Sequence, residues 1–247
     1  MRFRRPAVLV LALLILPLLW IAGAVYGQRF DHWSQARWDS AGLAPDPATT
    51  PEAVIQVYAA RTWGWKGIFG VHSWLALKRP DAHAYERYEV VGWGVRRGSP
   101  AVRRGMRTVD GYWAGNPPDL LLDRRGPEAA ALIKRVERAI EAYPYPDIYR
   151  TWPGPNSNTF VAYVGRAVPE LGLELPPTAI GKDFLGGTAF FGPTPSGTGY
   201  QLSLFGLLGI SLAIAEGLEI NLLGSTIGID VDDLAIKLPG VGKVGFL

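Results

Sequence analysis

The chain has 247 residues, of which 48% are apolar and 11% aromatic, and this composition is sufficient for a packed core. Its formal charge is +3, but Arg2, Arg4 and Arg5 account for that excess and leave 22 basic and 22 acidic residues elsewhere. A nucleic-acid partner is therefore not expected, because the main body has no basic excess to attract phosphates. The absence of cysteine excludes disulfides, thiolate metal sites and a cysteine nucleophile.

The N-terminal segment carries the clearest signal for location. An apolar run without charged residues extends from Ala7 to Tyr26, and about 20 apolar residues suffice for a helix to cross a bilayer. The arginines that precede the run place the N-terminus in the cytoplasm by the positive-inside rule. We therefore expect a single-pass protein of the bacterial inner membrane that contacts the bilayer through residues 7–26. A cleaved signal peptide is the alternative, since Ala22-Gly23-Ala24 resembles a small-residue cleavage site.

A cluster of prolines separates the N-terminal segment from the rest of the chain. The cluster Pro45, Pro47 and Pro51 predicts a juxtamembrane linker over residues 28–51, after an anchor over residues 1–27. A single extracytoplasmic α+β domain is expected over residues 52–247.

Short β-branched and aromatic runs predict an antiparallel sheet at the start of this domain, with strands over residues 53–61, 67–77 and 85–93. Two main helices should follow. The first begins at Pro127 and ends before Pro144, and its apolar residues recur at helical spacing. The second begins near Ser157 and stops before Pro169.

The C-terminal third contains no charged residue between Phe184 and Ala215. A second membrane span or an interfacial segment is one interpretation of that run. From Tyr200 to Ile214, however, large apolar residues occupy the even positions except Gly206, and small or polar residues most of the odd ones. This period of two is typical of a strand, so a C-terminal β-meander is predicted.

Few side chains are candidates for chemistry. Of the three histidines, His32 falls in the linker and His83 in a turn, whereas His72 falls in a strand. A lone strand histidine is more often a structural residue than a functional one. No two histidines have metal-ligand spacing, so neither a metal site nor a cofactor is expected.

The segment from Trp152 to Phe160 combines a Pro-Gly-Pro turn with the run Asn156-Ser157-Asn158-Thr159. These are residue types that cap helix N-termini, where free backbone N–H groups and a positive dipole end also suit an anion or an oxyanion. Ser157 is therefore either a helix cap or a reactive group.

Four motifs together resemble a bacterial membrane-anchored family, the domain of unknown function 3750, over roughly residues 50–245. The motifs are Val71-His72-Ser73-Trp74, the strand from Arg87 to Gly94, the turn from Trp152 to Phe160, and the loop from Leu175 to Asp183. A family without an assigned activity implies no function.

A more distant similarity is to circularly permuted papain-like hydrolases, in which a strand histidine precedes a nucleophile at a helix N-terminus. This resemblance implies a permuted papain-like arrangement with Ser157 as nucleophile, His72 as general base, and Glu89 or Tyr88 as its orienting residue. N–H groups near Asn158 and Thr159 would form the oxyanion hole. The substrate would be an amide or ester of the envelope, such as peptidoglycan peptide or lipid.

The serine departs from that family's cysteine, and a serine hydroxyl is harder to activate than a thiol. The other interpretation is therefore a non-catalytic domain that keeps the cleft as a binding groove for cell-wall or lipid headgroups. The expected binding residues are Asn156, Asn158, Thr159, Trp152, Tyr88, Arg103 and Arg104.

Overall fold

The structure is a computed structural model that describes Leu19, Gly23 and residues 33–245. Within this described part of the chain, no helix is both long and apolar enough to cross a membrane. The anchor expected over residues 7–26 lies outside the described residues apart from Leu19 and Gly23. It stays a prediction.

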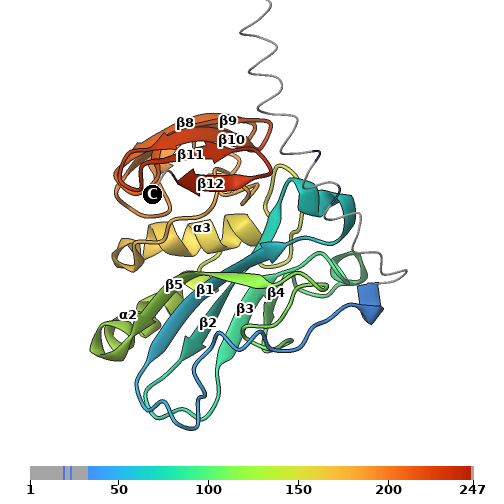
Figure 1. The fold of residues 1–247 in the computed structure, drawn as a ribbon, viewed down its shortest axis with the longest axis vertical. Coiled ribbons are helices and arrows are strands. Elements are labelled where there is room, and N and C mark those ends of the chain that lie inside the picture. The colour runs from blue at the N-terminus through green and yellow to red at the C-terminus, as the bar shows by residue number, and fades with distance from the viewer. Residues whose placement is uncertain (1–18, 20–22, 24–32, 246–247) are drawn as a thin grey trace, which may run out of the picture.

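Two antiparallel sheets and two long helices make up the domain, which confirms the predicted α+β class (Figure 1). The helices are α2 (Gly126–Glu141) and α3 (Ser157–Ala167), with short 3-10 turns η1 (Trp33–Gln35), η2 (Gly64–Ile68), η3 (Val95–Arg97) and η4 (Pro169–Leu171). The strands of the first sheet are β1 (Val54–Arg61), β2 (Val71–Lys78), β3 (Glu86–Val90), β4 (Val102–Arg104) and β5 (Pro118–Arg125). The strands of the second sheet are β6 (Phe191–Pro193), β7 (Gly199–Leu204), β8 (Leu208–Ala213), β9 (Gly217–Leu222), β10 (Ser225–Asp230), β11 (Ala235–Leu238) and β12 (Gly242–Gly245).

The first sheet has the strand order β4-β3-β2-β1-β5 and confirms the predicted antiparallel pairing. The strand expected over residues 67–77 starts only at Val71, because η2 occupies the preceding residues. Sequence patterns did not indicate β5, which begins with a proline and contains three consecutive leucines instead of an alternating pattern. As an edge strand beside β1, it can accept that proline without losing an inner ladder hydrogen bond.

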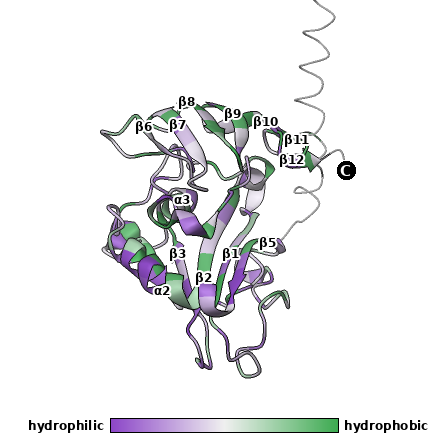
Figure 2. Ribbon diagram, turned by 90° about the vertical axis from the view of Figure 1, so that its left-hand side faces the viewer, coloured by the Kyte–Doolittle hydropathy of each residue, from purple (hydrophilic) through white to green (hydrophobic). Residues whose placement is uncertain are grey.

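Helix α3 lies between the two sheets, and α2 packs on the same face of the first sheet (Figure 1). Figure 2 shows the same layering from the side, with α2 away from the second sheet and hydrophilic residues along its length. Ile55 of β1 and Leu75 of β2 are fully buried with Phe160 and Val164 of α3 in the main core. Apolar packing on both sides of α3 thus fixes the position of its N-terminus.

The opposite face of the first sheet is covered by the segment that precedes β1. Backbone hydrogen bonds join Ala41 N to Asp110 O at 3.1 Å and Tyr112 N to Asp39 O at 2.9 Å. Ala36 lies in a second core cluster with Trp74 and Trp113. Residues 33–44, predicted from sequence as part of a linker, are therefore bonded to the folded domain.

The second sheet is a meander in which every strand pairs with its sequence neighbour, as predicted. Its polar face is turned inward, toward α3. Gln201, Ser211 and Glu219 are buried, whereas Leu202, Leu212 and Ile220 on the same strands are exposed. The sheet therefore has the reverse of the usual arrangement, in which the apolar face packs on the core.

Ion pairs neutralise the charged groups on this inner face. Lys237 Nζ lies 3.0 Å from Glu219 Oε1 and 2.7 Å from Glu174 Oε1, and Lys182 also pairs with Glu219. Burial by itself would raise the pKa of Glu219, but the charges of Lys182 and Lys237 outweigh burial and hold that pKa below its usual value. The carboxylate therefore remains ionised between two ammonium groups.

Removal of the Glu219 charge should destabilise the protein strongly, because two buried ammonium groups lose their shared partner. We expect Glu219→Gln to lower the free energy of unfolding by about 3 kcal/mol, measured by urea unfolding of the full chain in detergent micelles. The matched control is Glu170→Gln, which removes an exposed partner of Arg135 and should change stability little. Equal effects of the two substitutions would contradict this account of the inner face.

Candidate functional site

The first turn of α3 is capped by Asn156, not by Ser157. The side-chain Oδ1 of Asn156 accepts hydrogen bonds from the backbone N–H groups of Asn158 at 2.9 Å and Thr159 at 3.1 Å. In return, the Thr159 Oγ1 accepts the backbone N–H of Asn156 at 3.2 Å, which completes a capping box. Ser157 is the first residue inside the helix, so the capping role considered for it belongs to Asn156.

The remaining polar atoms of this turn tie α3 to a neighbouring loop. Asn156 Nδ2 donates to Ile180 O at 3.0 Å, and Thr159 Oγ1 donates to Gly181 O at 2.9 Å. Gly181 has a φ of +98°, and a Cβ there would lie 2.5 Å from Asn156 Nδ2. This position therefore requires glycine. Asn156 and Thr159 serve the structure of the helix entrance.

Asn158 connects the helix to β2. Its Oδ1 accepts a hydrogen bond from Ser73 Oγ at 2.8 Å, and its Nδ2 donates to Val71 O at 3.0 Å and to Ile180 O at 2.9 Å. The side-chain amide thus has partners for both of its donors and for its acceptor. Asn158 is a buried bridge between helix, strand and loop.

The expected histidine pair with Glu89 is formed. His72 Nε2 lies 2.9 Å from Glu89 Oε2, and Arg87 Nη2 donates to the same oxygen at 3.0 Å. An ionised carboxylate only accepts, so Nε2 carries the proton and His72 is the donor. The Trp113 ring stacks on the imidazole with centroids 3.6 Å apart. The cluster of His72, Arg87, Glu89 and Trp113 is buried on the side of the sheet that faces away from α3.

Burial sets the ionisation of this cluster. It lowers the pKa of His72, and the hydrogen bond that His72 donates to Glu89 offsets that effect only in part. Burial would also raise the pKa of Glu89, but its bond to His72 and the charge of Arg87 together lower that pKa to about 2. The cluster therefore holds a neutral imidazole beside an ionised carboxylate that Arg87 balances.

The expected pair of Ser157 and His72 is not formed. Consecutive side chains of a strand point to opposite faces. Ser73 reaches the first turn of α3 through Asn158, so His72 points away from that turn and into the other core cluster. Among the described residues, the hydrogen-bonded partner of the His72 ring is Glu89. The imidazole cannot act as a base for Ser157 in this structure, because the sheet lies between them.

Tyr88 and the two expected arginines belong to other contacts. Tyr88 Oη donates to Glu86 Oε2 at 2.6 Å on the helix-covered face, so Glu89 and not Tyr88 orients His72. Arg104 pairs with Glu86 at 2.5 Å, and Arg103 Nη2 donates to Trp93 O at 2.8 Å.

Trp152 is half exposed, and its indole N–H donates to Leu223 O at 2.9 Å in the turn between β9 and β10. It therefore joins the Pro-Gly-Pro turn to the meander. The peptide bonds Trp152–Pro153 and Gly154–Pro155 in that turn are both cis.

One group of three carboxylates in the described chain has metal-like spacing. Oxygens of Glu174, Asp230 and Asp233 lie within 4.8 Å of one another. Lys243 Nζ pairs with each of them, at 3.0 Å from Glu174 Oε2 and 2.6 Å from Asp230 Oδ2. An ammonium group therefore takes the place that a cation would need.

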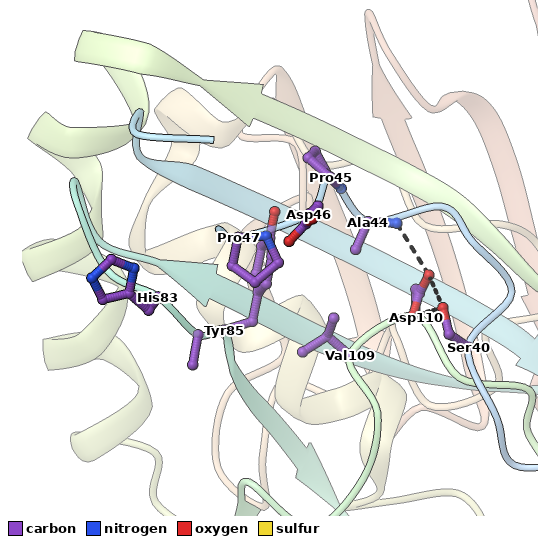
Figure 3. Close-up of a pocket in the computed structure, with 10 residues that line it drawn as sticks. Ser40, Ala44, Pro45, Asp46, Pro47, His83, Tyr85, Val109 and Asp110 are labelled. Carbon is purple, nitrogen blue, oxygen red and sulfur yellow. Dashed lines mark hydrogen bonds between the residues drawn. The ribbon is translucent and has the colours of Figure 1, made fainter. Parts of the chain in front are cut away.

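A pocket lies between residues 40–47 and the start of β3 (Figure 3). Its acidic group, Asp110, accepts hydrogen bonds from Ser40 Oγ at 2.8 Å and from the backbone N–H of Leu43 at 2.7 Å. His83 stands exposed at its edge. The bonds of Asp110 serve to fix the segment before β1, and the pocket is lined by none of the residues expected at the site.

Three residues with structural roles were not predicted from the sequence. Ser73 bonds to Asn158 at the first turn of α3, and Arg87 and Trp113 contact Glu89 and His72 in the buried cluster on the other face of the sheet. A signal for Ser73 was present, because Val71, Leu75 and Leu77 share its strand face and mark it as the core face. No local pattern brings Trp113 to His72, since they are 41 positions apart in sequence.

Comparison with known proteins gives one family. The model of the family described as Protein of unknown function (DUF3750) matches residues 52–184. This range runs from β1 through α3. It includes the cluster around His72 and the first turn of α3, but it stops before the meander. Comparisons with curated proteins and with solved structures gave no match.

The buried cluster predicts acid sensitivity. The pKa of His72 is lowered on folding, so as pH falls below about 6.5 the unfolded chain takes up a proton that the folded chain refuses. Below about 4.5, Glu89 adds to the loss, because its pKa falls to about 2 on folding. Urea unfolding of the full chain in detergent micelles should show stability falling steadily from pH 7 to pH 4.

The variant His72→Gln isolates the histidine contribution, since glutamine can still donate to Glu89. Its stability should fall less between pH 7 and pH 5 than that of the parent chain. An identical pH profile for the two chains would show that His72 is not buried in its neutral form.

Proposed function

Because the chain belongs to the family Protein of unknown function (DUF3750), whose description assigns no activity, we propose its function from the site geometry and from the sequence. The protein is a membrane-anchored domain of the bacterial envelope that binds a ligand and carries out no catalysis. Residues 7–26 are its anchor in the inner membrane, the N-terminus is cytoplasmic, and the domain is periplasmic or extracytoplasmic.

The observation that carries the non-catalytic role is the separation of Ser157 from His72 by the first sheet. Catalysis by a serine needs a base within hydrogen-bond reach of its hydroxyl. In the structure Ser73, not His72, faces the first turn of α3, and its hydroxyl is bonded to Asn158 at 2.8 Å. The order of strand histidine before helix serine is then a permuted papain-like arrangement without the catalytic pair, which supports binding over hydrolysis.

The proposed ligand is an anionic group of the cell wall or of a lipid headgroup. Arg104 is held by Glu86, so it offers less charge to a ligand than the sequence suggested. Arg96 and Arg97 of η3 are exposed, and the half-exposed Trp93 precedes them. Exposed guanidinium groups suit phosphate or carboxylate recognition, and the exposed part of the Trp93 indole offers an apolar contact for the same ligand. These three residues are therefore the proposed ligand contacts.

The non-catalytic role predicts that Ser157 is unreactive. A serine-reactive fluorophosphonate should label the full chain no more than it labels Ser157→Ala, because no base activates the hydroxyl. Labelling is measured by in-gel fluorescence. Stoichiometric labelling that disappears in Ser157→Ala would overturn the proposal.

A thiol variant makes the comparison sharper, since the chain contains no cysteine. The variant Ser157→Cys carries a single thiol at the start of α3, and its alkylation by iodoacetamide can be followed against pH. The midpoint of that profile should be unchanged when His72→Gln is added. A midpoint that rises on loss of the imidazole would show that His72 reaches the thiol.

The proposed topology predicts where the domain lies in cells. Ala131 is exposed on α2, so Ala131→Cys in the full chain provides a surface thiol. In intact bacterial cells with a permeabilised outer membrane, a membrane-impermeant maleimide should label this thiol without lysis. Labelling only after lysis would place the domain in the cytoplasm.

A further inference from the structure

We propose that the outer face of the seven-stranded sheet docks on the lipid bilayer, with its aliphatic side chains at the boundary between headgroups and acyl chains. This inference uses the membrane anchor of the proposed function. It does not use the proposed ligand site, because the sheet face lies outside residues 52–184. The occupant is the phospholipid leaflet in which the expected anchor is embedded.

The face is continuous. Leu202 pairs with Ile210, Ile210 with Ile220, and Ile220 with Ile227 across four neighbouring strands. A parallel row runs through Tyr200, Leu212, Leu218, Ile229 and Ile236. All of these side chains are exposed. Isolated exposed apolar residues are ordinary on soluble proteins, but a contiguous apolar sheet face marks an interaction surface.

The face also lacks charge. On β7 to β11 the charged side chains are Glu219, Asp230 and Lys237, and all three are buried on the inner side. Contacts with soluble proteins usually combine an apolar centre with a polar rim that forms hydrogen bonds. From β7 to β11 the outward strand positions are apolar except for the hydroxyl of Ser225 at the start of β10, which matches the acyl-chain region with its lack of hydrogen-bond partners.

Two turns add an independent observation. Phe205 and Leu223 have φ values of 55° and 54°, and each precedes a glycine that also has positive φ. Such turns favour Asn or Asp before Gly, and a bulky residue in this conformation costs about 1–2 kcal/mol. Leu223 is mostly exposed, and Phe205, which packs edge-to-face on the exposed Phe190, keeps part of its ring in contact with water. Large apolar residues at strained, exposed turn positions are suited to insertion into lipid.

The expected anchor keeps the domain close to the membrane. Trp33, at the start of η1, lies seven residue steps after Tyr26, at the end of the apolar run. Even fully extended, they span at most about 25 Å. The domain would therefore remain near the bilayer surface, where weak contacts of many side chains act together.

The orientation follows from the edges of the sheet. The sheet is open, with β6 and β12 as its edge strands in the described part of the chain. Unpaired backbone groups are costly in hydrocarbon, so the sheet cannot cross the membrane. It lies flat, with its edges in the hydrated headgroup layer and its side chains directed into the leaflet. An open apolar hollow lined by Leu218, Ile229 and Leu234 lies on the same face.

Single-cysteine variants test the proposal in the full chain. Leu212 and Ile229 have exposed fractions of 69% and 58%, so Leu212→Cys and Ile229→Cys should not disturb folding. Each thiol is labelled with the fluorophore NBD, and the protein is reconstituted into vesicles of phosphatidylethanolamine and phosphatidylglycerol. Vesicles with brominated acyl chains should remove most of the fluorescence at both positions. The matched control, Ala131→Cys on α2, should keep its fluorescence.

Two further measurements separate this proposal from others. Labels at 212 and 229 that are shielded from aqueous iodide but not quenched by brominated lipid would indicate a second copy or another protein on the face, and would overturn lipid docking. A label at Leu13→Cys reports on the anchor alone. If brominated lipid quenches this label but not the labels at positions 212 and 229, the anchor is supported and docking of the sheet face is overturned. If it quenches the labels at positions 212 and 229 but not the label at position 13, docking is supported and the anchor is overturned.

Discussion

Side-chain alternation along a strand is the constraint on which both halves of this structure depend. In β2 it directs Ser73 toward Asn158 on α3 and His72 toward Glu89 and Trp113 on the other face. In the meander it directs polar side chains inward and apolar side chains outward. A shift of one residue in either element would exchange the two faces. Alternation therefore separates the two would-be catalytic residues and also creates the apolar surface.

The reversed meander is stable because its polar face has partners. Arg166 of α3 donates to Pro193 O at 3.0 Å, and Lys182 and Glu219 pair between the loop and β9. The outer face has no such cover within the domain. Each aliphatic side chain removed fully from water contributes about 1.5–3 kcal/mol, whereas a folded domain is stable by only about 5–15 kcal/mol in total. The side chains of this face are already partly buried, so docking of the whole face would contribute a free energy of the same order as the stability of the domain.

Periodicity predicted most of the fold, since the two helices and the meander follow from patterns of 3.6 and 2 residues. It did not predict that the polar face of the meander is inside, because an alternating pattern normally places the apolar face on the core and only a polar partner reverses this. Here the polar partners are Lys182, which pairs with Glu219, and Arg166, which donates to Gln201; both lie outside the meander. At the site, the contact of His72 with Glu89 followed from adjacent strands. The pair with Ser157 failed because residue order does not define the face of a strand.

The central claim is that alternation leaves an apolar sheet face for lipid. Nitroxide labels at Leu202, Ile210 and Ile220, introduced singly through cysteine in the full chain in vesicles, report how oxygen and a water-soluble nickel chelate reach each position. The account predicts that oxygen, which concentrates in lipid, relaxes all three labels more than nickel does. Nickel-dominated relaxation at these positions, equal to that of a label on the exposed surface of α2, would contradict it.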